Sequence, residues 1–287
     1  MDFDYLVKLG LEKRLEATQA YFSLFEKTLV AAELDRLILG EKDSDKSYKT
    51  IHSSNEVANT LIHRAEKMSW IFKYVPFVES VLLCNYLSFG VAEEGSDIDL
   101  LIIAEKKRIY LCRFYATILL HLMRMRRHGK KISGRYCLSF YLSEDFLDLS
   151  KIEQKPYDVY LAYWFLALKE LISFDQLIWG NLLNENKVWL KRYFDKVDLR
   201  REPSGKYSTK SLPRKVCEWF YGGWFGDKIE ALLGCYFERR AAKLAKSLPE
   251  NASIVVSEHM QKFHNNDRRE FFRRGWEEKL NRLGLFK

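Results

Sequence analysis

Apolar and polar residues follow different spacings along the chain, and each spacing predicts a different kind of element. Residues 5–39 and 57–70 place apolar side chains every three or four positions, which is typical of amphipathic helices. In the middle of the chain the pattern changes to short, continuous apolar runs bounded by polar turns, which indicate buried strands. A longer stretch with helical spacing, 109–125, separates the second run from the third. The three runs are 77–83, 97–103 and 136–142.

Helical spacing returns in the last part of the chain, which is expected to be helical throughout from Tyr157 onward. Residues 157–172 are apolar on nearly every side, and this pattern predicts a buried helix. Prolines, a glycine and serines between 203 and 213 mark a linker. Helical spacing then continues through 215–246 and into the tail.

These patterns predict an α+β protein with a small mixed-sheet domain between two helical regions. The first region holds two helical stretches separated by the polar stretch Glu41–Lys49. This arrangement is compatible with a winged-helix module and equally with a helical cap on the sheet. The expected parts are a helical or winged-helix segment at 1–72, the mixed-sheet domain at 73–152 and an all-helical domain at 153–287.

Two carboxylates stand side by side where the second apolar run begins. In the sequence S-D-I-D, the alternation of a strand places Asp97 and Asp99 on the same face. Their charges repel each other, and a divalent cation removes that repulsion; Mg²⁺ typically takes one or two carboxylates together with substrate phosphates. The apolar run 77–83 and a polar turn containing Gly90 come just before them. This order of strand, turn and acidic strand suits metal-assisted nucleotidyl transfer.

The segment C-N-Y-L-S-F-G-V-A-E-E-G-S-D-I-D-L-L-I-I, residues 84–103, resembles the signature of the nucleotidyltransferase superfamily typified by DNA polymerase beta. That signature joins a Gly-Ser or Gly-Gly pair, through a short spacer, to Asp-x-Asp flanked by apolar residues. Asp97 and Asp99 match the second half, while Asn85 and Tyr86 stand where the glycine pair is expected. With C-L-S-F-Y-L-S-E-D further on, the segment is similar to a little-studied group of predicted bacterial nucleotidyltransferases in which the asparagine is usual.

The resemblance implies transfer of a nucleoside monophosphate from an NTP, with ATP as the expected donor, to a hydroxyl group. Asp97 and Asp99 would be the catalytic residues and would hold Mg²⁺ or Mn²⁺. The acceptor stays open between RNA or another nucleic acid, a protein hydroxyl and a small molecule. The residues expected to line the triphosphate turn, orient the carboxylates or reach a phosphate are Asn85, Tyr86, Ser88, Gly90, Ser96 and Arg113.

A third carboxylate usually lies on the next long strand in this superfamily, where this chain has Ser139 and Tyr141. Glu144 and Asp145, at the end of that strand, are the nearest acidic candidates, although capping of the following turn is the preferred interpretation. Without a third acid and without the glycine pair, an alternative function gains support. It is a catalytically weak or inactive regulator that binds a nucleotide or a nucleic acid.

The charge of the chain points to anionic partners. The formal net charge is +8, which favours binding of nucleotides or nucleic acids. A basic run without acidic residues follows the helical stretch 109–125, and it suits phosphate contact or, alternatively, a solvated helix end. The residues considered for contact with phosphate or nucleic acid are Arg124, Arg126, Arg127, Lys130 and Lys131.

The tail contains the sequence K-F-H-N-N-D-R-R-E-F-F-R-R-G-W, in which basic and aromatic residues are interleaved. Such a sequence can hold a single strand of nucleic acid by charge and stacking. At helical spacing the aromatic residues more often face the core while the arginines face solvent, and this is the preferred interpretation. His264 has no cysteine or second histidine at ligand spacing, so it is given no role in metal binding.

Cysteine usage and the N-terminal residues indicate the compartment. The five cysteines have apolar neighbours and form no C-x-x-C pair, which argues for reduced thiols and against a disulfide framework or a zinc site. The N-terminus lacks a cationic start followed by an apolar run, and no stretch is apolar enough to span a membrane. A cytoplasmic protein is therefore expected.

Overall fold

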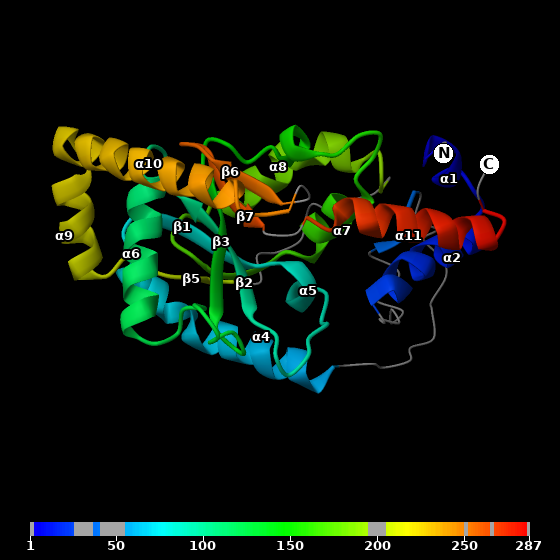
Figure 1. Ribbon diagram of the computed structural model, residues 1–287, viewed down its shortest axis with the longest axis horizontal. Helices are drawn as coiled ribbons and strands as arrows, with labels where there is room; N and C mark the ends of the chain where they lie inside the picture. The colour runs from blue at the N-terminus through cyan, green and yellow to red at the C-terminus, as the bar shows by residue number, and fades with distance from the viewer. Residues whose placement is uncertain are drawn as a thin grey trace.

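The centre of the protein is a seven-stranded mixed sheet with strand order β5-β4-β1-β2-β3-β7-β6 (Figure 1). The computed structural model describes residues 3–25, 37–40, 55–194, 205–249, 252–264 and 267–285. The strands are β1 (Val78–Leu83), β2 (Ile98–Ala104), β3 (Tyr136–Ser143), β4 (Lys169–Ser173), β5 (Lys206–Tyr207), β6 (Ser253–Val256) and β7 (Met260–His264).

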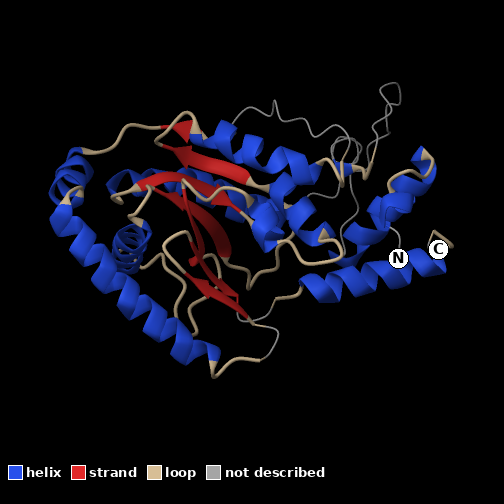
Figure 2. Cartoon of the chain, turned by 90° about the horizontal axis from the view of Figure 1, so that it is seen from above, coloured by secondary structure: helices blue, strands red, loops and turns tan. Residues whose placement is uncertain are grey.

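Helices cover both faces of this sheet, as Figure 2 shows. Short 3-10 helices occupy Ser23–Phe25, Ser69–Tyr74 and Leu149–Ile152. None of the helices among the described residues is long and apolar enough to cross a membrane. The α-helices are α1 (Phe3–Leu6), α2 (Leu11–Phe22), α4 (Glu56–Met68), α5 (Asn85–Ser88), α6 (Ile109–Leu122), α7 (Val159–Ala167), α8 (Ile178–Leu190), α9 (Leu212–Tyr221), α10 (Trp224–Ala245) and α11 (Arg269–Arg282).

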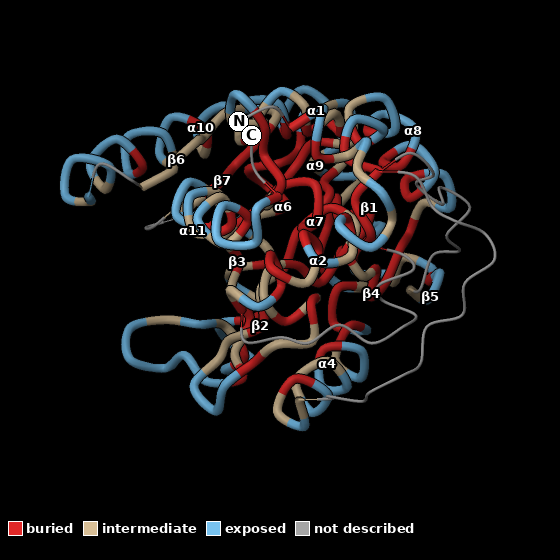
Figure 3. Tube along the Cα trace, turned by 90° about the vertical axis from the view of Figure 1, so that its right-hand side faces the viewer, coloured by how far each residue is buried: buried red, intermediate tan, exposed pale blue. Residues whose placement is uncertain are grey.

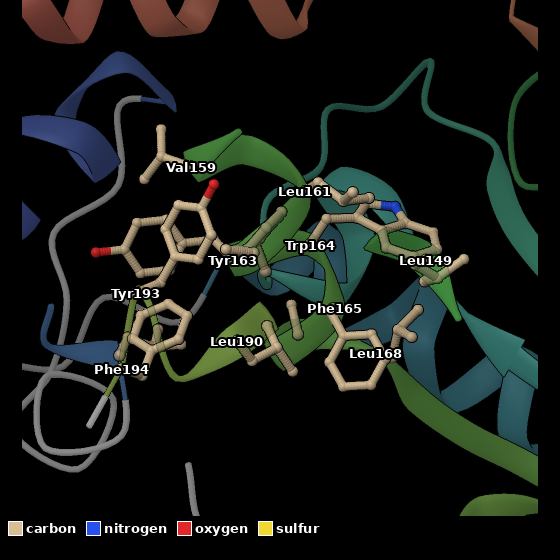
Figure 4. Packing of buried hydrophobic residues seen from close by; sticks show 14 of the residues in the cluster. Leu149, Val159, Leu161, Tyr163, Trp164, Phe165, Leu168, Leu190, Tyr193 and Phe194 are labelled. Carbon is tan, nitrogen blue, oxygen red and sulfur yellow. The ribbon is translucent and has the colours of Figure 1, made fainter. Parts of the chain in front are cut away.

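Strand alternation divides the core into two layers, one on each face of the sheet. In β2, Leu101 and Ile103 enter one layer, whereas Leu100 and Ile102 enter the other. The first layer includes α7, whose residues are buried on nearly all sides, as the sequence predicts (Figure 3). Figure 4 shows the side chains of this helix packed together with those of Leu190, Tyr193 and Phe194. The second layer is closed by α4 and α6.

The sheet is only partly paired between β3 and β7. β2 and β3 are parallel, with Asp99 beside Cys137. β3 and β7 are antiparallel, but they pair over three positions only, from Phe140 to Leu142 of β3. The first half of β3 is therefore not paired with β7, and this separation creates room for a cavity between the two strands.

The prediction that residues 153–287 are all helical is wrong, because this region supplies β4, β5, β6 and β7 to the sheet. The expected helix 157–172 ends early: α7 stops at Ala167, and β4 follows one residue later as an antiparallel neighbour of β1. A short apolar run fits a buried helix or a buried strand equally well. The hydrogen bonds to β1 stabilise the strand, and the local sequence does not reveal this pairing.

The expected helix 215–246 is divided into α9 and α10 by Gly222 and Gly223. A Cβ atom on Gly226 would lie 1.7 Å from the carbonyl oxygen of Tyr221, so the close approach of the two helices requires a glycine there. Gly226 therefore permits close packing of the two helices, and Gly222 and Gly223 mark the turn between them.

The N-terminal helices pack against the C-terminal helix. The indole N–H of Trp276 on α11 donates a hydrogen bond to the carbonyl oxygen of Ala17 on α2 over 2.8 Å. Figure 1 shows both chain ends on the same side of the molecule. The winged-helix prediction depends on the polar stretch Glu41–Lys49, which lies outside the described residues, and it stays a prediction.

Candidate metal and nucleotide site

The two carboxylates of the acidic strand meet a thiol from the neighbouring strand. Asp97 and Asp99 stand at the start of β2, and the parallel register places Cys137 of β3 beside Asp99. The candidate ligand atoms of these three side chains all lie within 4.8 Å of one another. Two oxygen donors and one sulfur donor therefore converge on one point at the end of the sheet.

Asp99 is partly buried, as are the other two members of this group. Burial, followed by the neighbouring charge of Asp97, raises the pKa of the Asp99 carboxyl group to about 6. Hydrogen bonds from Asn85 and Cys137 and the charge of Arg127 act in the opposite direction. Burial also raises the pKa of the Cys137 thiol, to about 12. In this environment negative charge is poorly solvated, so a bound cation would stabilise the group strongly.

A positively charged side chain already occupies the edge of this group. The Nη1 atom of Arg127 lies 2.6 Å from Oδ2 of Asp97 and 3.8 Å from Sγ of Cys137. The guanidinium group thus contacts two of the three donors and partly neutralises their charge. Arg127 was considered from the sequence as a phosphate contact, whereas its contact here is with a carboxylate.

The group opens into a cavity of about 690 Å³. Residues from β3 and β7 line it where the pairing of these strands ends, and helices α6, α7 and α10 complete the wall. Three acidic side chains line the cavity, Asp97, Asp99 and Asp267. Seven basic side chains also line it: Arg113, Arg126, Arg127, Arg240, Lys262, Arg268 and Arg269. The excess of positive charge suits a ligand with several negative charges.

Seven of the residues predicted from the sequence lie on this cavity: Asn85, Tyr86, Asp97, Asp99, Arg113, Arg126 and Arg127. The others lie outside its lining. The Ser88 hydroxyl donates to the Asn85 carbonyl oxygen, and the Ser96 hydroxyl accepts from the Glu93 N–H, so both hold turns. Gly90 has a left-handed backbone, with φ of 74°. The remaining predicted residues outside the lining are Arg124, Lys130 and Lys131.

Asn85 and Tyr86, which replace the glycine pair, are held by contacts within the protein. Oδ1 of Asn85 accepts a hydrogen bond from the Trp164 indole N–H over 2.8 Å. The ring of Tyr86 packs edge-on against Phe25 and Phe272, with centroids 5.4 and 6.2 Å apart. Both residues line the cavity, but the Asn85 amide oxygen and the Tyr86 ring are already engaged in contacts that hold the turn in place.

Glu144 and Asp145 lie far from the carboxylate pair along the strand. Ser143, the residue before them, pairs with Ala104 at the far end of β2. Glu144 accepts the backbone N–H of Lys106, and Asp145 accepts the hydroxyl of Ser143 over 2.6 Å. Glu144 therefore caps the turn that follows β2, and neither residue takes part in the group of Asp97 and Asp99.

The tail contributes to the cavity, and sequence reasoning missed this. Lys262, Asp267 and Arg269 form a connected set of ion pairs in its wall, at 3.1 and 2.8 Å to Asp267. Arg269 also contacts Asp158 at 2.9 Å. The concentration of charged residues in K-F-H-N-N-D-R-R is the sequence feature that could have predicted this contribution. Of the aromatic residues of α11 that follow, Phe272 and Trp276 are buried, as preferred from the sequence, whereas Phe271 is exposed.

Replacing Asp267 by Asn is expected to lower the free energy of unfolding by about 1–3 kcal/mol at pH 7. The reason is that Lys262 and Arg269 hold the pKa of Asp267 well below its ordinary range, since burial is outweighed by these contacts. A depressed pKa gives stability that is present above about pH 4 and is lost as the pH falls. The difference between wild type and variant in urea unfolding should therefore shrink from pH 7 to pH 3. A constant difference would contradict this explanation.

Comparisons with known proteins assign the chain to no group: no family model, no curated protein and no solved structure matches it.

Proposed function

We propose that the protein is a metal-dependent nucleotidyltransferase, which moves a nucleoside monophosphate from an NTP to a hydroxyl group and releases pyrophosphate. One observation carries this proposal: two carboxylates and a thiol converge within 4.8 Å on the wall of a cavity in which basic side chains outnumber acidic ones. A cation held there would lie next to the surface that attracts a polyphosphate. This is the arrangement that phosphoryl transfer needs.

The donor set fits a divalent cation. Asp97 and Asp99 offer the hard oxygen ligands that Mg²⁺ and Mn²⁺ prefer, and Cys137 adds a softer donor that favours Mn²⁺ over Mg²⁺. Arg127 already places a positive charge on two of the donors. When bound, the cation would neutralise charge on the phosphate oxygens. Arg127 would then be free to turn toward the same phosphates.

The other cavity residues would bind and orient the donor. Arg268 at the start of α11 is held near the Tyr86 hydroxyl, 3.4 Å away, and faces the cavity. Tyr160 and Trp164 of α7 also line the cavity and offer aromatic rings on which a base can stack. Catalysis would rest on in-line positioning and on neutralisation of charge, without a covalent intermediate on the protein.

A regulator that binds a nucleotide without turnover is the second candidate. The specific observation in its favour is that, within the described residues, the third donor of the group is the Cys137 thiol in place of a carboxylate. A third carboxylate normally helps to deprotonate the acceptor, and Cys137 with a raised pKa is a poor base. Asn85 and Tyr86 also leave less room for the triphosphate turn than a glycine pair would.

The deciding experiment measures pyrophosphate release from each of the four NTPs with Mg²⁺ or Mn²⁺. RNA, protein and small hydroxyl compounds are supplied as acceptors, and the NTP carries a label on its α-phosphate. Release with labelling of one acceptor class would support the transferase and identify that class. Tight NTP binding without release would favour the regulator. If the protein neither binds an NTP nor releases pyrophosphate, both proposals are overturned.

A further inference from the structure

Three arginines in the cavity have no acidic partner within the part of the chain that the structure describes. Arg113 of α6, Arg126 from the turn after it and Arg240 of α10 all line the cavity. Among the described residues, no carboxylate forms an ion pair with any of them, whereas Arg127 and Arg269 are paired with aspartates. Two of them donate long hydrogen bonds to neutral oxygen atoms: Arg113 to the Gln261 amide oxygen at 3.3 Å and Arg240 to the Tyr236 hydroxyl at 3.2 Å.

Arg113 is fixed in place by aromatic rings. Its guanidinium carbon lies 4.2 Å from the ring centre of Phe263, 5.1 Å from that of Tyr141 and 5.5 Å from that of Phe237. Such cation–π contacts orient the group without neutralising its charge. Phe237 stands three residues before Arg240 on α10, so the two residues share one side of that helix.

The three positive charges act on one another. Burial lowers the pKa of Arg113, and the charges of Arg126 and Arg240 lower it further, which places the three groups within electrostatic range. A buried charge without a counter-charge is costly. Arg113 and Arg126 are partly buried, and Arg240 is exposed. Three positive charges around one cavity wall repel one another, and an anion that binds between them stabilises the arrangement. Thr117, one helical turn after Arg113, adds a hydroxyl to the same wall.

We propose that Arg113, Arg126 and Arg240 form a phosphate subsite beside the Asp97–Asp99 pair. Arginine suits this task because its planar group donates two parallel hydrogen bonds to phosphate oxygens. The phosphate belongs either to the donor NTP or to a phosphorylated acceptor, and the experiment below separates the two sources. The catalytic meaning of the subsite rests on the proposed function, whereas phosphate binding itself does not.

The test is calorimetric titration of the full chain with inorganic phosphate in the presence of a metal chelator. Arg240→Gln is expected to weaken phosphate binding about tenfold or more, as for the loss of one charge-assisted hydrogen bond. Arg239→Gln is the matched control, because Arg239 is exposed on the same helix and does not line the cavity. Arg126→Gln, on another element, should repeat the loss. Equal affinities in the Arg240 and Arg239 variants, or no binding by wild type, would overturn the proposal.

A second titration identifies the source of the phosphate. A non-hydrolysable ATP analogue is bound first, and inorganic phosphate is then added. If phosphate still binds and Arg240→Gln leaves the affinity for the analogue unchanged, the subsite serves an acceptor. If the analogue displaces phosphate and the variant binds the analogue more weakly, the subsite serves the NTP. Phosphate binding in a protein that lacks turnover would overturn the transferase and leave the subsite standing.

The outer surface of the protein also has an unusual apolar region. Helices α9 and α10 present an apolar face to solvent at one end of the molecule (Figure 1), and α10 is largely exposed in Figure 3. Trp219 is 83% exposed and Trp224 is 69% exposed, which is unusual for the largest apolar side chain. The apolar residues of this face that are more than half exposed are Leu212, Val216, Trp219, Phe220, Trp224, Leu232 and Tyr236.

Charge on this face is basic. Lys228, Arg239 and Lys243 of α10 are exposed and follow the same side of the helix as Leu232. The acidic residues of the helix point elsewhere: Glu230 accepts the backbone N–H groups of Tyr110 and Leu111, and the other two contact Arg108 and Tyr110. A second copy docked by two-fold symmetry would bring basic side chains together, whereas an anionic surface attracts them.

We infer that this face lies on the surface of an anionic lipid bilayer. The exposed tryptophans and phenylalanine would enter the boundary between headgroups and acyl chains, and the basic residues would contact the headgroups. Lys228 lies 3.9 Å over the ring of Trp224, so apolar and basic contacts belong to one surface.

Co-sedimentation with vesicles tests this inference. The chain is expected to sediment with vesicles of phosphatidylcholine and phosphatidylglycerol, and much less with phosphatidylcholine alone. Trp219→Ser combined with Trp224→Ser should lower the bound fraction at least several-fold. Val188→Ser, at a 77% exposed site on α8, is the matched control. No binding to anionic vesicles would overturn the inference, as would a dimer in sedimentation velocity that the double variant abolishes.

Discussion

Replacing Asp99 by Asn is expected to reduce nucleotidyl transfer by at least about a hundredfold, because the variant loses the charge on which a cation depends. The substitution keeps the size and the hydrogen-bonding shape of the side chain. Asp99 is partly buried and is hydrogen-bonded to Asn85 and Cys137, so a neutral amide should be tolerated there and the fold should remain intact. Burial disfavours the charged carboxylate, and the variant is therefore expected to be as stable as wild type, or more stable.

The measurement compares pyrophosphate release by the variant with its binding of Mn²⁺. Binding is monitored as the decrease in the electron paramagnetic resonance signal of free Mn²⁺. Both should fall together. Asp145→Asn is the matched control, because Asp145 lies at the far end of the strands and accepts a hydrogen bond from Ser143. Unchanged release in the Asp99 variant would show that turnover, where it is observed, does not use the acidic strand. Equal losses in both variants would point to a general defect in folding.

Much of the central sheet follows from local sequence. The runs expected as strands at 77–83, 97–103 and 136–142 match β1, β2 and β3 to within a residue or two, and the intervening helix matches α6. Their apolar residues are continuous because the strands are covered on both faces, and this is a local signal. The same holds for the position of the two aspartates, since strand alternation alone places them on one face.

Relations between distant segments were not predictable in the same way. Cys137 joins the carboxylates because β2 and β3 are parallel in one particular register, and no single segment encodes that register. Asp267 and Arg269 reach the cavity because β7 pairs with β3 more than a hundred residues earlier in the chain. The strand β4 was missed for the same reason: its apolar run becomes a strand only because β1 offers it an open edge.

Trp276→Ala is expected to lower the free energy of unfolding by about 3–5 kcal/mol, which is the usual cost of removing a large buried aromatic side chain. Trp276 is 0% exposed and packs among Phe3, Tyr21 and Tyr157, with ring centres 6.1 to 6.5 Å away. It also donates a hydrogen bond to the Ala17 carbonyl oxygen. The variant therefore loses packing and a buried hydrogen bond at the place where the two ends of the chain meet.

Unfolding in urea measures the loss, and two further variants separate its parts. Phe271→Ala, at a 61% exposed site on the same helix, should cost much less, because little buried surface is lost. Trp276→Phe keeps a ring in place but leaves the Ala17 carbonyl oxygen without its donor, which should cost an intermediate amount. If Trp276→Ala cost no more than Phe271→Ala, the contact between α2 and α11 would not contribute to stability. If the expected order is found, the first helices of the chain are held by the last one, and through Arg269 this same helix helps to build the cavity wall.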